Sequence, residues 1–237
     1  MGTGQLIGSG RSADVFAIDR DWVLRRYRNG DDATVEAEVM AYLAERGYPV
    51  PRVRAPEAAE AGVATAGDLV LRRLRGPSML VALGRGTVGA EEAGATLGAL
   101  LNTLHAIPAR LSTDPAVRVL HLDLHPDNVM LTPAGPMVID WCNSEEGPPG
   151  LDWAMSALIL AQVAVGPMAE AAVARAVLPS LLRRIAPSVR WGNAEAGCLA
   201  EARARRAADP AMSEAETGLL DDAVRLVLTH TPPSASG

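Results

Sequence analysis

The stretch that most constrains this chain is residues 119–141, VLHLDLHPDNVMLTPAGPMVIDW. A short apolar run leads into a polar loop that carries His121 and Asp123, and Asn128 follows Asp123 after four intervening residues. Two apolar segments then flank a turn that contains Pro and Gly, which predicts a β-hairpin, and Asp140 stands directly after the second segment. The two predicted strands are Val129–Leu131 and Met137–Ile139.

This order of residues resembles the catalytic loop and metal-binding segment of the protein-kinase-like superfamily, H-R-D-x-x-x-x-N followed by D-F-G. The closer likeness is to the aminoglycoside phosphotransferase and choline kinase branch. There the loop reads roughly H-G-D-L-H-x-x-N, and the second motif is often I-D-W or I-D-F. Here the loop is HLDLHPDN at residues 121–128, and the second motif is IDW at residues 139–141. The resemblance implies a kinase-like fold and the transfer of a phosphoryl group.

The resemblance also assigns roles within this stretch. Phosphoryl transfer depends on positioning and charge neutralisation more than on covalent help from the protein. We expect Asp123 to accept the proton of the incoming hydroxyl. We expect Asn128 and Asp140 to hold Mg²⁺, since hard cations prefer oxygen ligands. His125 stands where protein kinases carry a Lys that faces the γ-phosphate, and it either serves there or anchors the loop; His121 is expected to buttress the loop.

Two other interpretations of the stretch stay open from the sequence. Asp, Asn, His and Pro are common in turns, so an ordinary surface hairpin accounts for any one of these residues taken singly. The alternation of His121, Asp123 and His125 is also typical of metal ligands on a strand, which would indicate a metal-dependent hydrolase. Only His105 and His230 remain as further imidazoles, and the sequence shows no other cluster of ligands.

Composition restricts the class of protein further. The 237 residues are 49% hydrophobic, which suffices for the core of one domain or two small lobes. The net charge of −6 gives no reason to expect a nucleic-acid partner, and two cysteines are too few for a disulfide framework. No secretory signal opens the sequence, and the longest apolar run, Trp153–Gly166, is too short to span a bilayer. We therefore expect a cytoplasmic protein without a membrane partner, of open oligomeric state.

A turn near the N-terminus resembles the glycine-rich loop of kinases, G-x-G-x-x-G-x-V. Gly8, Ser9 and Gly10 occupy its first positions, and Ala13 stands where the third glycine is expected. Glycines let backbone N–H groups approach phosphate oxygens closely. The resemblance therefore implies that Gly8, Ser9 and Gly10 contact the phosphates of ATP or GTP.

All 22 basic residues of the chain are Arg, whereas kinases use a Lys on the third strand to bind the α- and β-phosphates. The expected third strand, Trp22–Tyr27, carries Arg25 and Arg26 in succession. Side chains alternate faces along a strand, so only one of the two can point toward a nucleotide. The family pattern V-x-K places Arg25 at the Lys position, with Arg26 as the alternative.

A helix over Ala33–Arg46, ending at Gly47, is expected after this strand. The resemblance implies a Glu on this helix that pairs with the base on the third strand, and the alignment favours Glu36 over Glu38. Apolar residues at helical spacing predict the buried face of the helix. They are Val35, Val39, Tyr42 and Leu43.

Residues 48–53, YPVPRV, resemble the G-x-P-V-P-x-V stretch of the aminoglycoside phosphotransferase family, and their prolines favour an extended edge segment. Asp68–Leu74 is apolar enough for a further strand. In the implied fold the adenine lies against the backbone at Arg73 and Leu74, where no side-chain signature is expected. A nucleotide-binding N-lobe is thus predicted at residues 1–75.

Residues 76–231 are predicted to form a mostly helical C-lobe with the catalytic loop and the acceptor site, and residues 232–237 a disordered tail. Asp152 opens one of its helices, where the family has an Asp that braces the catalytic loop. Many small-molecule kinases of the family carry a helical insertion before the catalytic loop, and its absence here leaves the acceptor unidentified. The predicted helices are Glu91–Ala106, Leu151–Val165, Met168–Ile185, Ala194–Ala207 and Ser213–Thr229.

The sequence therefore predicts an α+β, bilobal protein-kinase-like fold, with a small five-stranded N-lobe containing one helix and a mostly helical C-lobe. The expected activity is phosphorylation of a hydroxyl on a small molecule by ATP or GTP with Mg²⁺. One alternative is a catalytically silent nucleotide-binding protein, favoured by the missing Lys and by Ala13. The others are a metal-dependent hydrolase and a protein kinase, although no A-P-E segment follows Asp140.

Overall fold

The computed structural model describes residues 4–10, 12–30, 32–56, 65–186, 189 and 196–231. The chain divides into two compact units. We call Met1–Gly76 with Met130–Ser144 the sheet unit, and Pro77–Val129 with Glu145–Gly237 the helical unit. The boundary predicted after residue 75 places residues 130–144 in the helical lobe, whereas the structure groups them with the sheet. The tail predicted at residues 232–237 lies outside the described residues.

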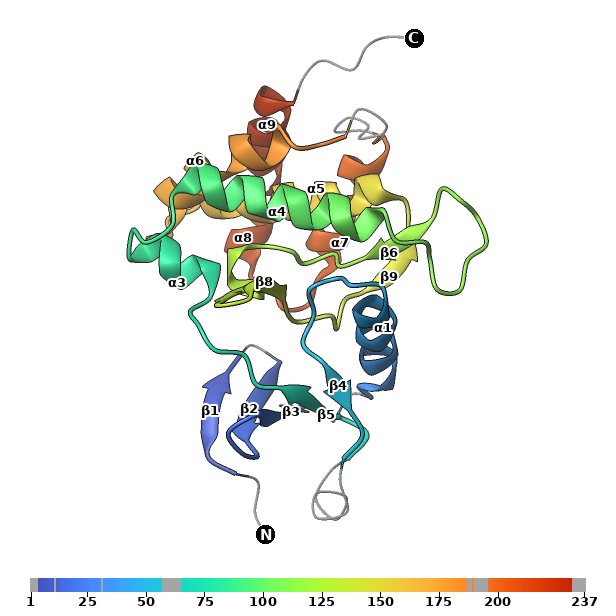
Figure 1. The fold of residues 1–237 in the computed structure, drawn as a ribbon. Coiled ribbons are helices and arrows are strands. Elements are labelled where there is room, and N and C mark those ends of the chain that lie inside the picture. The colour runs from blue at the N-terminus through green and yellow to red at the C-terminus, as the bar shows by residue number, and fades with distance from the viewer. Residues whose placement is uncertain are drawn as a thin grey trace. The chain divides into compact units, whose positions relative to one another are not determined.

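A five-stranded antiparallel sheet forms the body of the sheet unit, in the order β1-β2-β3-β5-β4 (Figure 1). The predicted five-stranded sheet is confirmed. Along β3 the alternation of faces separates Arg25 from Arg26 and puts Arg25 on the same face as Tyr27. The strands are β1 (Leu6–Ser9), β2 (Ala13–Ala17), β3 (Trp22–Tyr27), β4 (Val53–Arg54) and β5 (Asp68–Arg72).

One helix, α1 (Thr34–Glu45), follows the first three strands of this unit. Gly47 follows the C-cap residue of this helix, and its φ of +77° lies in the left-handed region that glycine adopts without a Cβ penalty. The predicted helix and its glycine stop are both confirmed.

The buried face predicted for α1 is partly wrong. Val35 is 59% exposed, and the carboxylate of Glu36 is buried instead. Glu36 is buried because it pairs with Arg25 on β3. An ion pair contributes nothing to a hydrophobic pattern, so the pattern did not reveal this position. The buried residues of the helix are Glu36, Val39, Met40 and Leu43.

The predicted hairpin is present as β7 (Val129–Thr132) and β8 (Gly135–Val138). Gly135, at φ +116°, closes the two-residue turn, and its carbonyl accepts a 2.8 Å bond from the Thr132 hydroxyl. Beyond the hairpin, Trp141 is fully buried and its ring meets that of Tyr48 edge-on, with 5.7 Å between centroids. These contacts fix the chain on both sides of Asp140 within the sheet unit.

The helical unit is built around α5 (Pro149–Val165), which is buried along almost its whole length and packs against α6, α7 and α9. The helix predicted over Ser213–Thr229 is interrupted at Leu219, so it forms two helices, and α3 was not predicted. The predicted capping box of Ser213 and Glu216 is confirmed. The other elements are α3 (Met79–Gly84), α4 (Ala90–His105), β6 (Arg118–Leu120), β9 (Glu145–Gly147), α6 (Ala171–Leu182), α7 (Cys198–Ala208), α8 (Glu214–Gly218) and α9 (Leu220–His230).

Close packing of α4 against α6 depends on a glycine. A Cβ placed on Gly94 would lie 2.5 Å from the carbonyl oxygen of Val177 and 2.6 Å from the Cβ of Ser180. A hydrogen bond of 2.8 Å from the Ser180 hydroxyl to the Glu91 carbonyl also joins these two helices. The two backbones can approach this closely only because residue 94 has no side chain.

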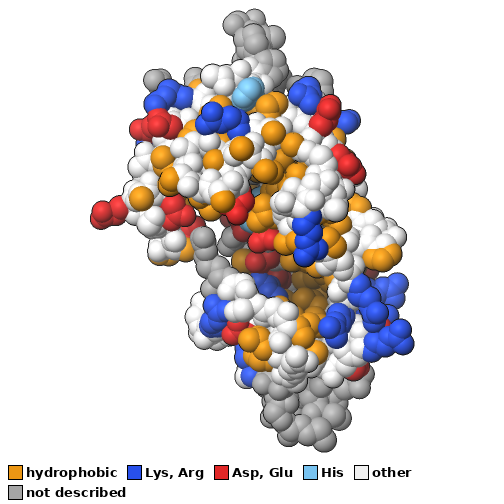
Figure 2. All heavy atoms as spheres, turned by 90° about the vertical axis from the view of Figure 1, so that its left-hand side faces the viewer, with side chains coloured by type: hydrophobic (Ala, Val, Ile, Leu, Met, Phe, Trp, Pro, Cys, Tyr) orange, Lys and Arg blue, Asp and Glu red, His pale blue; other side chains and the backbone are white. Residues whose placement is uncertain are grey.

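Arginine side chains gather on the surface of the sheet unit, in the lower part of Figure 2. Exposed pairs of this unit include Arg28 with Asp14 at 2.6 Å and Arg72 with Asp21 at 3.2 Å. Such solvent-screened pairs contribute little to stability. Within the described residues, no helix is long and apolar enough to cross a bilayer.

Candidate active site

Asp152, in the first turn of α5, binds the backbone of the loop at residues 121–128. The carboxylate of Asp152 accepts bonds from the backbone N–H groups of His121, at 3.0 Å, and Leu122, at 2.7 Å. Its oxygen Oδ2 also lies 3.0 Å from Nε2 of His105. Burial opposes ionisation of Asp152, but the bonds and charge of His105 and His121 outweigh it and hold the pKa below its usual range. Asp152 is thus a buried anion that fixes the loop.

The backbone of both predicted motifs is strained. Leu122 has φ +63° and Asp140 has φ +65°, in the left-handed region that side chains other than glycine rarely adopt. Each such residue costs on the order of 1–3 kcal/mol and persists only where the surroundings hold it. For Leu122 that support comes from the bond between its N–H and Asp152.

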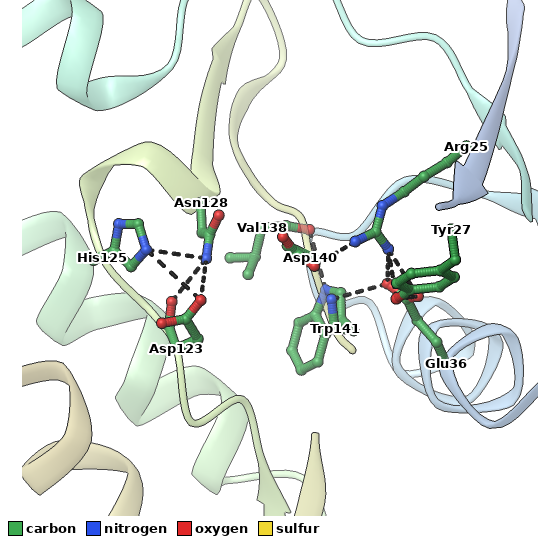
Figure 3. Close-up of polar contacts among 9 residues, drawn as sticks. All are labelled: Arg25, Tyr27, Glu36, Asp123, His125, Asn128, Val138, Asp140 and Trp141. Carbon is green, nitrogen blue, oxygen red and sulfur yellow. Dashed lines mark hydrogen bonds and ion pairs between the residues drawn. The ribbon is translucent and has the colours of Figure 1, made fainter. Parts of the chain in front are cut away.

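Asp123, His125 and Asn128 converge within the loop (Figure 3). The Asn128 amide nitrogen donates to the Asp123 carbonyl at 2.9 Å and to Asp123 Oδ2 at 3.1 Å. His125 Nε2 lies 3.7 Å from the same Oδ2, too far for a hydrogen bond but close enough for an ion pair when the ring is protonated. Burial raises the pKa of Asp123, but the opposite effect of His125, His121 and Arg206 is larger, so the net pKa lies below its usual range. The carboxylate is therefore ionised and can accept a proton.

Both histidines of the loop use a ring nitrogen to fix the backbone. His121, which is fully buried, accepts a bond of 3.2 Å from the Asp123 N–H at Nδ1. His125 accepts one of 3.3 Å from the Asp127 N–H, also at Nδ1. This arrangement braces a turn and is not the one expected of alternating metal ligands. Across the described ranges, no group of three or more His, Cys, Asp or Glu side chains is placed to hold a metal ion.

Sequence reasoning missed a support on the far side of the loop. The Ser78 hydroxyl caps α3 by accepting from the Val81 N–H at 3.3 Å, and it donates to Asp127 at 2.8 Å. Asp127 lies in the 3₁₀ turn η1 (Pro126–Asn128) that carries Asn128. The Ser78-x-x-Val81 start of α3 was the available signal, because serine is a favoured N-cap residue.

In the sheet unit, Arg25 joins three separate segments of the chain (Figure 3). Its Nη1 donates to both oxygens of Glu36, at 2.6 and 2.8 Å, and its Nη2 donates to Asp140 at 2.5 Å. Arg25 is 8% exposed and Glu36 is 5% exposed. Arg26 projects from the other face of β3 and binds Asp68 in a two-pronged pair, at 2.7 and 2.8 Å. The register of β3 therefore brings Arg25, and not Arg26, to Glu36 and Asp140.

Two more residues complete the surroundings of Glu36, and sequence reasoning missed both. The Tyr27 hydroxyl donates to Glu36 at 2.5 Å, and the Trp141 backbone N–H donates to it at 3.0 Å. Burial first and the charge of Glu36 second raise the pKa of Tyr27. The position of Tyr27 two residues after Arg25 was a signal, since both side chains must share a face of the strand.

Cys142 is an exposed residue whose thiol lies next to the carboxylate of Asp140. Burial first, and then the carboxylate of Asp140, raise the pKa of Cys142 to about 12. The thiol is therefore protonated at neutral pH, and a protonated thiol is a poor nucleophile.

Of the three residues predicted for the glycine loop, Gly8 and Ser9 end β1, where they pair with Val15 and Asp14 of β2, and Gly10 begins the turn between the strands. Gly10 N–H donates to the Ala13 carbonyl at 2.9 Å, and the Ser9 hydroxyl donates to Asp14 at 2.7 Å. Hydrogen bonds from Arg28 and Ser9 lower the pKa of Asp14 to about 2. Among the described residues, a Cβ on Gly8 or Gly10 would meet nothing closer than 3.6 Å, so contacts with that part of the chain do not require glycine at either position.

Arg73 and Leu74 follow β5 in an irregular segment. The Arg73 N–H donates to the Asp21 carbonyl at 2.8 Å. Leu74 makes no hydrogen bond within the part of the chain that the structure describes.

A five-stranded antiparallel sheet with helix α1, followed by a helical part that carries a braced His-x-Asp loop, defines an α+β protein of the kinase-like fold. The family model described as "Phosphotransferase enzyme family" matches residues 3–117 and 108–188, which is more than half of the chain. The chain belongs to this phosphotransferase family, and both the predicted fold class and the predicted family are confirmed. No curated protein matches the sequence.

Solved structures share the fold at low sequence identity. The choline/ethanolamine kinase family protein from Mesorhizobium loti gives a TM-score of 0.56 at 16% identity, over 99% of this chain and 90% of its own. ADP-bound aminoglycoside phosphotransferase APH(2'')-Ib gives 0.53 at 12% identity, over 95% and 92%. Macrolide 2'-phosphotransferase MphH from Brachybacterium faecium gives 0.51 at 16% identity, over 92% and 91%. At these identities the likeness shows the fold alone.

Proposed function

We propose that this protein transfers the γ-phosphoryl group of ATP or GTP to a hydroxyl of a small molecule. Residues 1–75 would bind the nucleotide, and residues 76–231 would supply the catalytic loop and the acceptor site. The proposal places the reaction in the cytoplasm, where the nucleotide and Mg²⁺ are supplied. It assigns no partner beyond the small-molecule acceptor.

The observation that carries the proposal is the ion cluster of Arg25, Glu36 and Asp140, in which Arg25 and Glu36 are buried and Asp140 is partly exposed. Three segments that each resemble a different kinase motif meet there, through contacts of 2.5–2.8 Å. Burying the Glu36 carboxylate and the Arg25 guanidinium is costly unless they are paired. A protein that needed only a stable core would be served as well by apolar residues, so the cluster favours a binding role for the cation.

In the proposed reaction the acceptor oxygen attacks the γ-phosphorus as the bond between that phosphorus and the β,γ-bridging oxygen breaks. Asp123 takes the hydroxyl proton, and the nucleoside diphosphate leaves with the bridging oxygen. The lowered pKa of Asp123 supports this role, because a base must be ionised at working pH. His125, an ion-pair distance of 3.7 Å from Asp123, would orient that carboxylate or face the γ-phosphate.

Asn128 and Asp140 would hold Mg²⁺, which neutralises phosphate charge when bound. Their donor chemistry fits, since amide and carboxylate oxygens are the ligands that hard cations prefer. The Asn128 amide nitrogen faces Asp123, which turns the amide oxygen away from that carboxylate (Figure 3). Asp140 keeps 32% of its side chain exposed.

The segment formed by Gly8, Ser9 and Gly10 would lie along the phosphates. Glycine at residues 8 and 10 is not required by packing against the described residues, which supports a requirement set by a ligand. The backbone at Arg73 and Leu74 would meet the base, and the absence of a hydrogen bond at Leu74 within the described residues supports that role. ADP in the related structure of APH(2'')-Ib supports a nucleotide as the ligand.

One observation favours a second candidate, a silent nucleotide-binding protein. Arg25 stands where a Lys is expected, and it occupies an oxygen of Asp140 at 2.5 Å. If this ion pair persists in the presence of nucleotide, Asp140 is restricted as a metal ligand and turnover is lost.

Calorimetric titration with ATP, with and without Mg²⁺, followed by measurement of ADP release tests both candidates. Acceptors for the second step should include gentamicin, a macrolide and choline, together with hydroxyl compounds of other classes. Acceptor-dependent ADP release that disappears in Asp123→Asn is the result expected of the enzyme. Mg²⁺-dependent nucleotide binding without turnover on any acceptor supports the silent protein, and no nucleotide binding at all overturns both.

A further inference from the structure

Tyr27 contacts both members of the buried pair in the sheet unit. It is 7% exposed, and its hydroxyl donates to Glu36 Oε2 at 2.5 Å and accepts from Arg25 Nη1 at 3.1 Å (Figure 3). The central carbon of the Arg25 guanidinium also lies 4.7 Å from the centre of the Tyr27 ring. A ring at this distance attracts the cation by a cation–π interaction. One side chain therefore fixes Arg25 by its hydroxyl and by its face.

An arginine at this position needs such support more than a lysine does. Lysine presents one compact ammonium, whereas arginine presents a planar fork whose two ends point in different directions. Here Nη1 is directed at Glu36 and Nη2 at Asp140. Rotation of the fork would misdirect both ends at once. The Tyr27 hydroxyl is an additional partner of Nη1, so it selects the orientation that leaves Nη2 on the Asp140 side.

Tyr27 also completes the environment of Glu36. The Glu36 carboxylate accepts from Arg25 on both oxygens, from the Trp141 N–H on Oε1 and from the Tyr27 hydroxyl on Oε2. A buried carboxylate with unmet acceptors would be free to turn toward water. With the Tyr27 bond in place, Glu36 presents a fixed anion to Arg25.

We propose that Tyr27 is a positioning residue for the phosphate-binding cation, and that it compensates for the replacement of lysine by arginine at residue 25. This proposal rests on the proposed function. It requires that the Tyr27 hydroxyl and Arg25 be coupled. Loss of the hydroxyl disturbs nucleotide binding when residue 25 is Arg, and disturbs it much less when residue 25 is Lys, because an ammonium has no fork to orient.

The first test is a double-mutant cycle on the dissociation constant of MgATP, with Tyr27→Phe, Arg25→Lys and the double variant. Tyr27→Phe should raise the dissociation constant about tenfold, the usual cost of a hydrogen bond to a charged group. In the Arg25→Lys background the same change should alter it by less than about twofold.

Tyr42→Phe is the matched control. The half-buried Tyr42 lies on α1, and the central carbon of the Arg46 guanidinium lies 3.5 Å from the centre of its ring. Loss of the Tyr42 hydroxyl should leave the affinity for MgATP unchanged. Equal effects in both backgrounds, or a folded Tyr27→Phe variant with wild-type affinity, overturn the proposal.

The second test needs no nucleotide, so it separates this proposal from the proposed function. Nitrogen-15 NMR of the Arg25 guanidinium, assigned by comparison with Arg25→Lys, should show slow rotation of the Nη groups and a contact between their hydrogens and the Tyr27 ring in the wild-type protein. In Tyr27→Phe, at a temperature where it is folded, the rotation should become fast. Rapid rotation in the wild type overturns the proposal even if the variant does not fold. If MgATP does not bind the wild type, the proposed function fails while this measurement still decides the role of Tyr27.

Discussion

Arg25 and Asp140 stand 115 positions apart in the sequence, and their side chains form an ion pair of 2.5 Å inside the sheet unit. The pair exists because the hairpin of β7 and β8 belongs to the same compact unit as β3. Asp140 is held there in a left-handed conformation, at φ +65°, between the hairpin and the buried ring of Trp141. The strand cation and the predicted metal ligand are therefore in direct contact within the sheet unit.

Asp140→Ala should abolish the Mg²⁺ dependence of nucleotide binding. The variant removes a carboxylate oxygen from the predicted metal site, and it also frees Arg25 Nη2. Isothermal titration with ATP at several Mg²⁺ concentrations measures the effect, and circular dichroism checks that the variant is folded. A folded variant with wild-type Mg²⁺ dependence would show that Asp140 is not a ligand.

Arg25→Ala should affect both stability and nucleotide binding, whereas Arg26→Ala should affect neither strongly. Removing Arg25 leaves the buried Glu36 carboxylate without its cation, which costs about 3–5 kcal/mol in the free energy of unfolding. The partner of Arg26, Asp68, has a buried side chain but keeps bonds from the N–H and hydroxyl of Thr65, so that loss should be smaller, about 1–2 kcal/mol.

Urea unfolding measures the stability of the two arginine variants, and the MgATP dissociation constant measures binding below their melting temperatures. Arg25→Ala should raise that constant more than about tenfold, as expected for the loss of a charge-assisted contact with phosphate. The opposite ranking of the two variants would place the phosphate-binding role on Arg26.

Asp123→Asn should retain nucleotide affinity and lose most turnover. A general base contributes roughly 10²–10⁴-fold, and an amide cannot accept the hydroxyl proton. The substitution preserves side-chain shape, and Asn128 can still donate to the backbone carbonyl of residue 123. ADP release with the best acceptor measures the effect. Turnover within about tenfold of the wild type would refute the role.

Much of this architecture could be predicted from the sequence because the signals are local. Trp22–Tyr27 was predicted as a strand with its observed bounds, alternation of faces along it predicted that Arg25 and Arg26 point to opposite sides, and Pro and Gly predicted the hairpin turn. The braced loop could be anticipated because a family pattern encodes it at fixed spacing. The contact of Arg25 with Glu36 was expected from the same pattern and is present in the structure.

What could not be predicted depends on pairs of residues that are distant in sequence. Val35 was expected to be buried, but Glu36 takes that face of α1 because its partners lie on β3 and after β8. The Ser78–Asp127 bond links a helix cap to a loop 49 positions away, and neither residue alone signals it. Polar interactions of this kind have no period, so hydropathy patterns cannot reveal them.

Gly94→Ala should destabilise the protein, although alanine is the better helix former. Its Cβ would lie 2.5 Å from the Val177 carbonyl oxygen, so α4 and α6 would have to separate, at a cost of about 1–3 kcal/mol. Gly84→Ala in α3 is the matched control, since a Cβ there meets nothing within 4 Å. The control should leave the melting temperature unchanged or raise it slightly. Equal melting temperatures for the two variants would contradict the close contact.

Asp152→Asn should destabilise the protein at neutral pH and weaken its sensitivity to acid. The carboxylate is fully buried and accepts from two backbone N–H groups and from His105, so replacing it by an amide should cost roughly 2–3 kcal/mol at pH 7. The pKa of Asp152 is lowered in the folded protein, whereas in the unfolded chain an Asp titrates near 4. Below that value the unfolded chain binds a proton that the folded protein does not, so stability falls with falling pH.

The contribution of Asp152 is therefore complete above about pH 5 and is lost as the pH falls through 4 toward the folded pKa. Urea unfolding of both proteins between pH 7 and pH 3 measures it as the difference in the free energy of unfolding. Other carboxylates with lowered pKa, such as Asp14 and Asp68, act equally in both proteins and cancel in that difference. A difference that stayed constant down to pH 3 would mean that Asp152 is not the ionised brace of the loop at residues 121–128. His105→Gln should lower stability less than Asp152→Asn does, because the two backbone bonds of Asp152 would remain.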